Sequence, residues 1–183
     1  MHHISILSSS IRTGRKSHNV ALYFQKYLSE NYPVTTEILD LKEYKFPLFE
    51  APLKYQKSPS ESALQFKEKI IVSDGVLVVT PEYNGGIPAS LKNAIDLLYE
   101  EWHRKPVAFS TVSSGDFGGL QALTHLQFVF WKIRAWTFTA NFPVSRVQEK
   151  FDDLGVPTNL QETDEFAKIF IDEFIKCIES SKK

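Results

Sequence analysis

Apolar positions along the chain follow two alternating spacings. Short runs are dense in β-branched and aliphatic side chains, and longer segments repeat an apolar side chain every three or four positions. The runs predict strands at residues 3–8, 34–41, 75–80, 106–112 and 135–140. The segments predict helices at residues 17–30, 88–99, 120–131 and 166–178, and a further helix that starts near residue 59.

The run at residues 75–80 reads GVLVVT and shows no alternation of apolar and polar side chains. A strand that is buried on both faces has this pattern, which is typical of parallel sheets covered by helices. Because strands and helices alternate along the whole chain, the sequence predicts a three-layer α/β fold with a five-stranded parallel sheet. The 183 residues are expected to form one domain, 1–183.

Two of the predicted helices carry capping signals at their starts. Ser58, Pro59 and Glu61 predict a helix with Ser58 as its N-cap and Glu61 closing a capping box. Thr163 is the expected N-cap of the last helix.

The loop after the first strand is a candidate anion site, because open parallel sheets bind ligands beyond the carboxyl ends of their strands. Residues 8–19 hold four serines, one threonine and three cations, and a helix begins where they end. Hydroxyl groups, backbone N–H groups, a helix N-terminus and arginine together predict a phosphate cradle. The alternative is an ordinary polar turn in which Ser17 caps the helix.

The loops at residues 80–88 and 112–119 each leave a buried strand and enter a helix. In the first of them Asn84-Gly85 is a turn signal, and Tyr83 offers a flat face to a ring. In the other, glycines and serines suit backbone contacts with the edge of a heterocycle. The alternatives are a tight turn beside a core tyrosine and a glycine-rich loop without a ligand. Together the loops predict a site for a planar ring that carries a phosphate.

Composition narrows the classes of partner and reaction. The formal net charge is −1, so no overall field attracts nucleic acid or an anionic membrane. Cys177 is the only cysteine, which excludes an internal disulfide and fits a cytoplasmic protein. We expect no signal peptide and no membrane span, which would need roughly 20 apolar residues. No metal-ligand cluster or acid–base pair stands out, so we expect no metal and no catalytic side chain.

The most specific motif is the run PEYNGGIP at residues 81–88, followed by LKNAID at residues 91–96. It resembles the PEYN-x-x-x-P-x-x-LKNAID signature of the NADPH-dependent FMN reductase family, which includes chromate, quinone and azo-compound reductases. Ser10-Ile11-Arg12, with Ser17 and Asn19, is similar to the family's phosphate loop. One departure is Ser9, where the family usually has glycine, so either this position needs no positive φ or the loop is reshaped.

The resemblance implies a flavodoxin-like fold and noncovalently bound FMN, with NADPH or NADH as co-substrate. The FMN phosphate is then expected at Ser10, Arg12, Ser17, His18 and Asn19. The ribityl chain and ring are expected at Pro81, Glu82, Tyr83, Asn84 and Gly85 on one side and at Ser113, Ser114 and Gly115 on another. The resemblance also implies a homodimer or homotetramer, with candidate contacts at Tyr99, Trp102 and the helix from Pro88.

The leading hypothesis is an enzyme in which NAD(P)H reduces FMN by hydride transfer. The flavin then reduces a small-molecule acceptor, which is a quinone, a free flavin, an azo or nitro compound, or a metal oxyanion. One alternative is a flavodoxin-like electron carrier or FMN-binding protein without NAD(P)H oxidase activity, and another is a scaffold that has lost FMN. Carriers that dock by charge tend to be strongly acidic, and this chain is near neutral.

Two other features have both a functional and a structural interpretation. The segment WHRK at residues 102–105 is a candidate for holding NAD(P)H phosphates, or else an exposed turn before a strand. His125 lies in an apolar helix and is expected to be a core histidine rather than a ligand.

Overall fold

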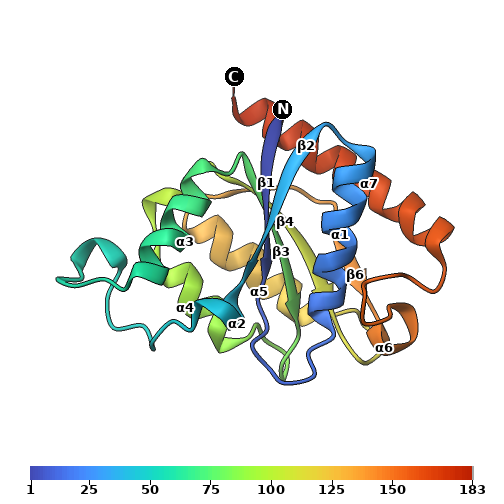
Figure 1. The fold of residues 1–183 in the computed structure, drawn as a ribbon, viewed down its shortest axis with the longest axis horizontal. Helices are drawn as coiled ribbons and strands as arrows, with labels where there is room; N and C mark the ends of the chain where they lie inside the picture. Colours follow the sequence, from blue (N-terminus) through green and yellow to red (C-terminus); the bar gives the residue numbers. More distant parts are fainter. Residues whose placement is uncertain (183) are drawn as a thin grey trace.

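The computed structural model describes residues 1–182 as an α/β fold in which helices cover both faces of one sheet (Figure 1). The strands are β1 (His2–Ser8), β2 (Val34–Asp40), β3 (Gly75–Pro81), β4 (Pro106–Val112), β5 (Trp136–Thr137) and β6 (Phe142–Val144). The strand order is β2-β1-β3-β4-β5, and β6 also pairs with β4. Every pairing is parallel, so the carboxyl ends of the strands lie along one edge of the sheet.

Two groups of helices cover the sheet. One face carries α1 (Ser17–Asn31) and α7 (Leu160–Ser181), and the other carries α3 (Glu61–Val72), α4 (Ala89–Leu97) and α5 (Leu120–Lys132). The connections contain the short helices α2 (Leu41–Tyr44) and α6 (Val147–Lys150) and the 3-10 turns Leu53–Tyr55 and Glu100–Trp102. Of the helices in residues 1–182, none has the length and apolar character needed to cross a membrane.

The core under α1 and α7 is built from aromatic side chains. Phe24 of α1, Phe142 of β6 and Phe170 of α7 are buried, and their ring centroids lie 4.9 to 5.9 Å apart. Burial of one such ring stabilises the fold by roughly 1.5–3 kcal/mol. Because these rings join β6 to α1, they also fix the loops that follow β1 and β4 relative to each other.

The structure confirms the alternation of strands and helices, but it shortens the last predicted strand and adds a sixth one after it. β5 pairs with residues 106–107 of β4, and β6 pairs with residues 110–112 of the same strand. Residues 138–141, which lie between β5 and β6, do not pair with β4. The ring of Phe138 instead lies 6.1 and 5.9 Å from the rings of Phe170 and Phe174 on α7. Packing against α7 therefore draws the chain out of the ladder, the strand predicted at 135–140 is shortened to β5, and β6 follows beyond the predicted range.

The predicted caps of α3 and α7 are wrong. The N-cap of α3 is Ser60, whose Oγ accepts a hydrogen bond from the backbone N–H of Ala63 at 3.2 Å. Glu61 is then the first helical residue and closes no capping box with Ser58. The N-cap of α7 is Asn159, and the Thr163 hydroxyl donates to the carbonyl of Asn159 at 2.7 Å from within the helix.

Candidate functional site

A cleft of about 190 Å³ lies beyond the carboxyl ends of β1, β3 and β4. Its walls are the first loop (residues 9–16), the second loop (residues 82–88), the third loop (residues 113–119) and α6. The predicted site residues that line it are Ser10, Arg12, Ser17, Pro81, Glu82, Tyr83, Ser113 and Ser114. The cleft also contains Gly14, Arg15, Lys16, Val112, Val147 and Gln148, which were not among the predicted site residues.

The first loop presents donors that have no acceptor in the described part of the chain. The hydroxyl of Ser17 is buried and has no hydrogen-bond partner within residues 1–182. It lies at the N-terminus of α1, where Lys16 gives no side-chain cap and the first turn holds no acidic residue. Arg12 is exposed and forms no ion pair within the same residues. A helix N-terminus with a free hydroxyl and a free guanidinium suits a phosphate.

Ser9 keeps an ordinary backbone conformation where the family usually has glycine. It is not among the residues of positive φ in the described chain, and its side chain is completely buried. Its N–H donates to the carbonyl of Val79 at 3.1 Å, and its carbonyl accepts from the Ser90 hydroxyl at 2.7 Å. The loop therefore runs between β3 and α4 without needing a glycine at this position.

Arg15 is the least exposed arginine of the first loop. Its guanidinium forms a two-point ion pair with Asp40, and it also donates to the carbonyl oxygen of Ser10 at 2.6 Å. Burial alone would raise the pKa of Asp40, but the hydrogen bonds from Arg15 and from the Lys42 N–H hold that pKa below its ordinary value. The pKa of nearby His18 is lowered by burial and by the charge of Arg15.

The second loop makes a tight turn that is tied to both neighbouring loops. Tyr83 and Gly86 exchange two backbone hydrogen bonds, and Asn84 and Gly85 have φ values of 50° and 76°. Two successive positive φ values are typical of a type I′ turn, which explains the Asn-Gly pair. The Tyr83 hydroxyl lies 2.6 Å from the Ser10 hydroxyl in the first loop.

Glu82 connects the second loop to α5. Its Oε2 accepts from the backbone N–H groups of Gln121 and Ala122 at 3.0 and 3.3 Å. The N-cap of α5 is Gly119, which has no side chain to cap the helix. Glu82 supplies that cap instead, so its carboxylate holds two loops together rather than pointing freely into the cleft.

The third loop is held by α6. The Gln148 side chain donates to the Ser114 carbonyl at 3.1 Å, and the Val147 N–H donates to the Ser113 carbonyl at 3.1 Å. Arg146 makes an ion pair with exposed Asp116. A four-residue helix in a polar stretch carries almost no periodic signal, so the sequence could not place α6 in the site.

Five of the predicted site residues do not line the cleft: His18, Asn19, Asn84, Gly85 and Gly115. The ring nitrogen Nδ1 of His18 lies 2.9 Å from the Ser8 hydroxyl. The side-chain amide of Asn19 donates to Asp153 at 3.3 Å. Asn84 and Gly85 form the tip of the second loop, and Gly115 lies in the third loop just outside the cleft wall. Their contacts with a ligand stay predictions.

Three other expectations are corrected by the structure. Trp102 is completely buried and donates its indole N–H to the Ile95 carbonyl at 3.2 Å, so it is a core residue rather than a subunit contact. His125 is exposed rather than in the core, and it lies beside Gly86 of the second loop. Residues 102–105 precede β4 at the amino end of the sheet, away from the cleft, so they do not belong to this site.

The chemistry available to these residues is binding and orientation. The described residues 1–182 contain no cluster of three His, Cys, Asp or Glu side chains that would hold a metal ion. The two titratable side chains of the second loop in the cleft, Glu82 and Tyr83, are engaged by α5 and by Ser10. Hydroxyls, backbone N–H groups and one free arginine form an arrangement that suits a phosphorylated cofactor.

Comparison with known proteins finds the same type of flavoenzyme by sequence and by structure. A family model described as NADPH-dependent FMN reductase matches residues 2–149. An NAD(P)H-dependent FMN reductase of Saccharomyces cerevisiae is 32% identical over 137 residues, which cover 68% of this chain and 71% of the yeast protein. A quinone reductase of Pseudomonas putida is 28% identical over 186 residues, which cover 98% of this chain and 96% of that protein.

The similarity extends to a solved flavoenzyme structure. FerB, an NAD(P)H:(acceptor) oxidoreductase from Paracoccus denitrificans, superposes on this chain with a TM-score of 0.80 at 27% sequence identity. The match covers 99% of both chains. The two folds therefore correspond over almost the whole length of both chains.

Proposed function

The chain belongs to the NADPH-dependent FMN reductase family and is an FMN-dependent NAD(P)H oxidoreductase, and on this premise we propose that the cleft of the three loops binds FMN. The observation that carries the proposal is the free hydroxyl of Ser17. It is buried without a partner within residues 1–182, at an uncapped helix N-terminus beside unpaired Arg12. Buried polar groups without partners are rare in native proteins, so this group suits an acceptor supplied by the ligand.

The phosphate of FMN is assigned to the first loop. Ser10 and Ser17 contribute hydroxyl groups, and Arg12 contributes the cation. A charge-assisted hydrogen bond of this kind is worth about 1.5–3 kcal/mol. The fit requires no change at Ser9, because its backbone already has an ordinary φ.

The ribityl chain and ring are assigned to the second and third loops. A cleft of about 190 Å³ is smaller than the roughly 300–1,000 Å³ of sites that enclose a drug-sized ligand. The cleft therefore suits the phosphate and ribityl chain, and the loop tips at half-buried Gly85 and exposed Gly115 are left for the ring. An ideal Cβ at either glycine meets no atom within 4 Å, so both backbones are open to a ligand.

Bound FMN supplies the hydride chemistry between NAD(P)H and an acceptor. The residues of this chain hold the phosphate, orient the ring and present backbone N–H groups to its edge. We propose a quinone as the acceptor, because a quinone reductase aligns with 98% of this chain. A free flavin, an azo or nitro compound and a metal oxyanion are the other acceptors to be tested.

We also propose a homodimer or homotetramer that works in the cytoplasm. α5 presents the exposed apolar side chains of Leu120, Phe128 and Trp131 along one stripe, which suits a contact between subunits. Cys177 is the single cysteine, which suits a reducing compartment. Sedimentation of the purified protein measures the oligomeric state.

Two measurements test the proposed function. The purified protein is expected to be yellow, with flavin absorbance that remains after gel filtration. Steady-state oxidation of NADPH and NADH in the presence of menadione is then expected to exceed oxidation without protein. A yellow protein that does not oxidise either nucleotide would be an electron carrier or storage protein, and a colourless protein that binds no added FMN would contradict the proposal.

A further inference from the structure

The first loop doubles back on itself and returns Arg15 beneath Ser10. Gly14 has a φ of 70°, and the Arg15 N–H donates to the Arg12 carbonyl at 3.3 Å. This turn brings the Arg15 guanidinium to the carbonyl oxygen of Ser10, to which it donates at 2.6 Å. The chain thus passes from Ser10 through exposed Arg12 to the mostly covered side chain of Arg15 within six residues, 10–15.

Asp40 is the anchor that holds Arg15 in this place. It is the last residue of β2, and β1–β2 pairing sets it beside Ser8, the residue from which the first loop departs. Its carboxylate accepts from two nitrogens of Arg15 and from the backbone N–H of Lys42. The side chains of Arg15 and Asp40 are only 11% and 15% exposed, so the pair is shielded from solvent. A two-point arginine–carboxylate pair is both strong and directional.

Ser10 is the residue whose orientation this pair determines. Its carbonyl accepts from Arg15, and its hydroxyl accepts from the Arg12 N–H at 3.3 Å and lies 2.6 Å from the Tyr83 hydroxyl. Fixing the carbonyl fixes the peptide between Ser10 and Ile11, one residue before Arg12. Arg15, at the edge of the cleft, therefore holds the loop through the Ser10 carbonyl, and the Arg12 side chain is left without a partner within residues 1–182.

We propose that Arg15 and Asp40 are positioning residues that give the cleft its preference for the phosphate of FMN. The proposal rests on the assignment of FMN to this cleft. The charge of Arg15 is matched by Asp40, so Arg15 does not bind the phosphate, and Arg12 is the cation that does. Arg15 instead keeps Ser10 and Arg12 in the binding arrangement before the ligand arrives, which lowers the ordering cost of binding.

Titration of the apoprotein with FMN and with riboflavin, which lacks the phosphate, tests this proposal for Asp40→Asn. The preference for FMN over riboflavin is expected to fall about 3- to 10-fold, because the loop must then be ordered on binding. Riboflavin affinity is expected to stay within about twofold, since its contacts lie in the other loops. Unchanged or tighter FMN binding would overturn the proposal, and so would an equal loss for both flavins, which would mean that the pair only holds the fold.

A double-mutant cycle separates positioning from direct binding. Arg15→Met and the combined Arg15→Met/Asp40→Asn variant are expected to lose about as much preference for FMN as Asp40→Asn alone, because a pair that acts as a unit is lost only once. A much larger loss for Arg15→Met would show that Arg15 binds the phosphate itself. If Arg15→Met fails to fold, Arg15→Lys takes its place, because lysine keeps the charge but not the two-point geometry. Its expected loss of preference for FMN is the same.

A remote ion pair provides the matched control. Lys168→Met removes the exposed pair of Lys168 with Asp172 on α7 and is expected to leave both flavin affinities unchanged. The same titration of the wild-type protein distinguishes a failure of this proposal from a failure of the proposed function. If the wild type shows no preference for FMN over riboflavin, the phosphate assignment itself fails. If that preference is present and Asp40→Asn retains it, only the positioning role fails.

Discussion

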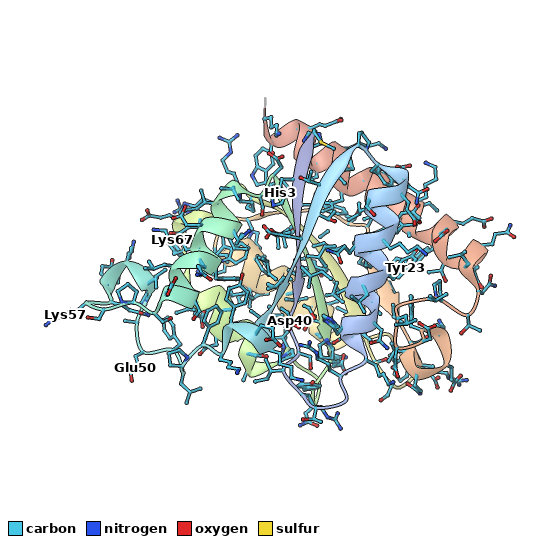
Figure 2. All side chains as sticks on the ribbon, viewed as in Figure 1. His3, Tyr23, Asp40, Glu50, Lys57 and Lys67 are labelled. Carbon is cyan, nitrogen blue, oxygen red and sulfur yellow. The ribbon has the colours of Figure 1, made fainter. Side chains whose placement is uncertain are left out.

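Both ends of the sheet are rich in charged side chains, but the two ends use them differently. Toward the amino end, Glu37 in the middle of β2 accepts a hydrogen bond from His3 at 2.9 Å and pairs with Lys69 at 2.7 Å. Lys105 donates to the carbonyls of Ile71 and Ser73 at the end of α3. Figure 2 labels His3 near this end and Asp40 near the other, where the cleft lies.

At the carboxyl end, some polar groups are left without partners. Arg15 is matched by Asp40, but Arg12 makes no ion pair and Ser17 has no hydrogen-bond partner within residues 1–182. A cluster of cations in the sequence therefore does not by itself mark a binding site. Exposed Arg104 and Arg134 at the amino end also make no ion pair within residues 1–182. What distinguishes the carboxyl end is that Arg12 and the buried Ser17 line one cleft.

The largest expected effect comes from removing the free cation of the cleft. Arg12→Ala is expected to weaken FMN binding by about 10- to 100-fold, because it deletes a charge-assisted bond worth about 1.5–3 kcal/mol. Riboflavin binding is expected to fall much less. Fluorescence titration with both flavins measures the difference. An equal loss of affinity for the two flavins would show that the phosphate of FMN does not bind in this loop.

A bulky residue at the tip of the second loop is the next test of the cleft end. Gly85→Val is expected to lower flavin affinity by about tenfold or more, through strain of roughly 1–2 kcal/mol at a positive φ and through a side chain placed where a ring is assigned. The fold is expected to survive, because a Cβ at Gly85 meets no atom within 4 Å. Circular dichroism and flavin content, measured on one preparation, check both expectations. A variant with its full flavin content would exclude Gly85 from the flavin contacts.

A variant at the amino end is expected to change stability and leave flavin binding alone. Burial alone would raise the pKa of Glu37, but hydrogen bonds from Lys69 and His3 hold it below its ordinary value of 4.5. Glu37→Gln is expected to lower the free energy of unfolding by about 1 kcal/mol at neutral pH, since the site is partly open to solvent. FMN affinity is expected to stay within about twofold.

The pH dependence of this loss follows from the lowered pKa. A carboxylate with a lowered pKa in the folded state contributes its full stability above the unfolded value, and the contribution disappears as pH falls through the folded value. The difference between wild type and Glu37→Gln is therefore expected to be complete above about pH 5 and to vanish in more acidic solution. Urea unfolding across that range measures it, and a difference that grows in acid would contradict the assignment.

The smallest expected effect tests whether the cleft does proton chemistry. Tyr83→Phe and Glu82→Gln are each expected to keep the rate of flavin reduction by NAD(P)H within about threefold when the protein is saturated with FMN. Tyr83 loses only its bond to Ser10, and a glutamine at position 82 still offers an oxygen to α5. Stopped-flow absorbance gives the rate. A fall of about 10²- to 10⁴-fold with FMN still bound would show that one of these side chains acts as an acid or base.

The sequence predicted the parallel sheet and the three loops because each depends on local patterns. A buried strand, a glycine-rich loop and a helix start can all be read within about ten residues. The sequence could not predict that Arg15 is occupied, because its partner Asp40 lies on another strand and meets it only through the pairing of β1 with β2. For the same reason the sequence could not predict that the Glu82 carboxylate caps α5, and the contact of Glu82 with the flavin stays a prediction.

The helix starts show a more local limit of sequence reasoning. Ser58 and Ser60 are both suitable caps, and only the turn of the chain selects Ser60. Similarly, residues 138–141 are apolar enough for a strand, but Phe138 faces α7. In both cases the side chain is right for the predicted element, and packing against a distant helix or a small shift of the chain decides the outcome.

The two termini of the described chain meet at the end of the sheet opposite the cleft (Figure 1). Lys182 lies 3.2 Å from a ring nitrogen of His2 and pairs with Asp74 at 2.8 Å. An immobilisation tag on either terminus would therefore tether the protein with its cleft turned toward solution. A fluorescent reporter fused there would sit far from the flavin loops, and a short linker between the two ends would allow circular permutation with new termini elsewhere.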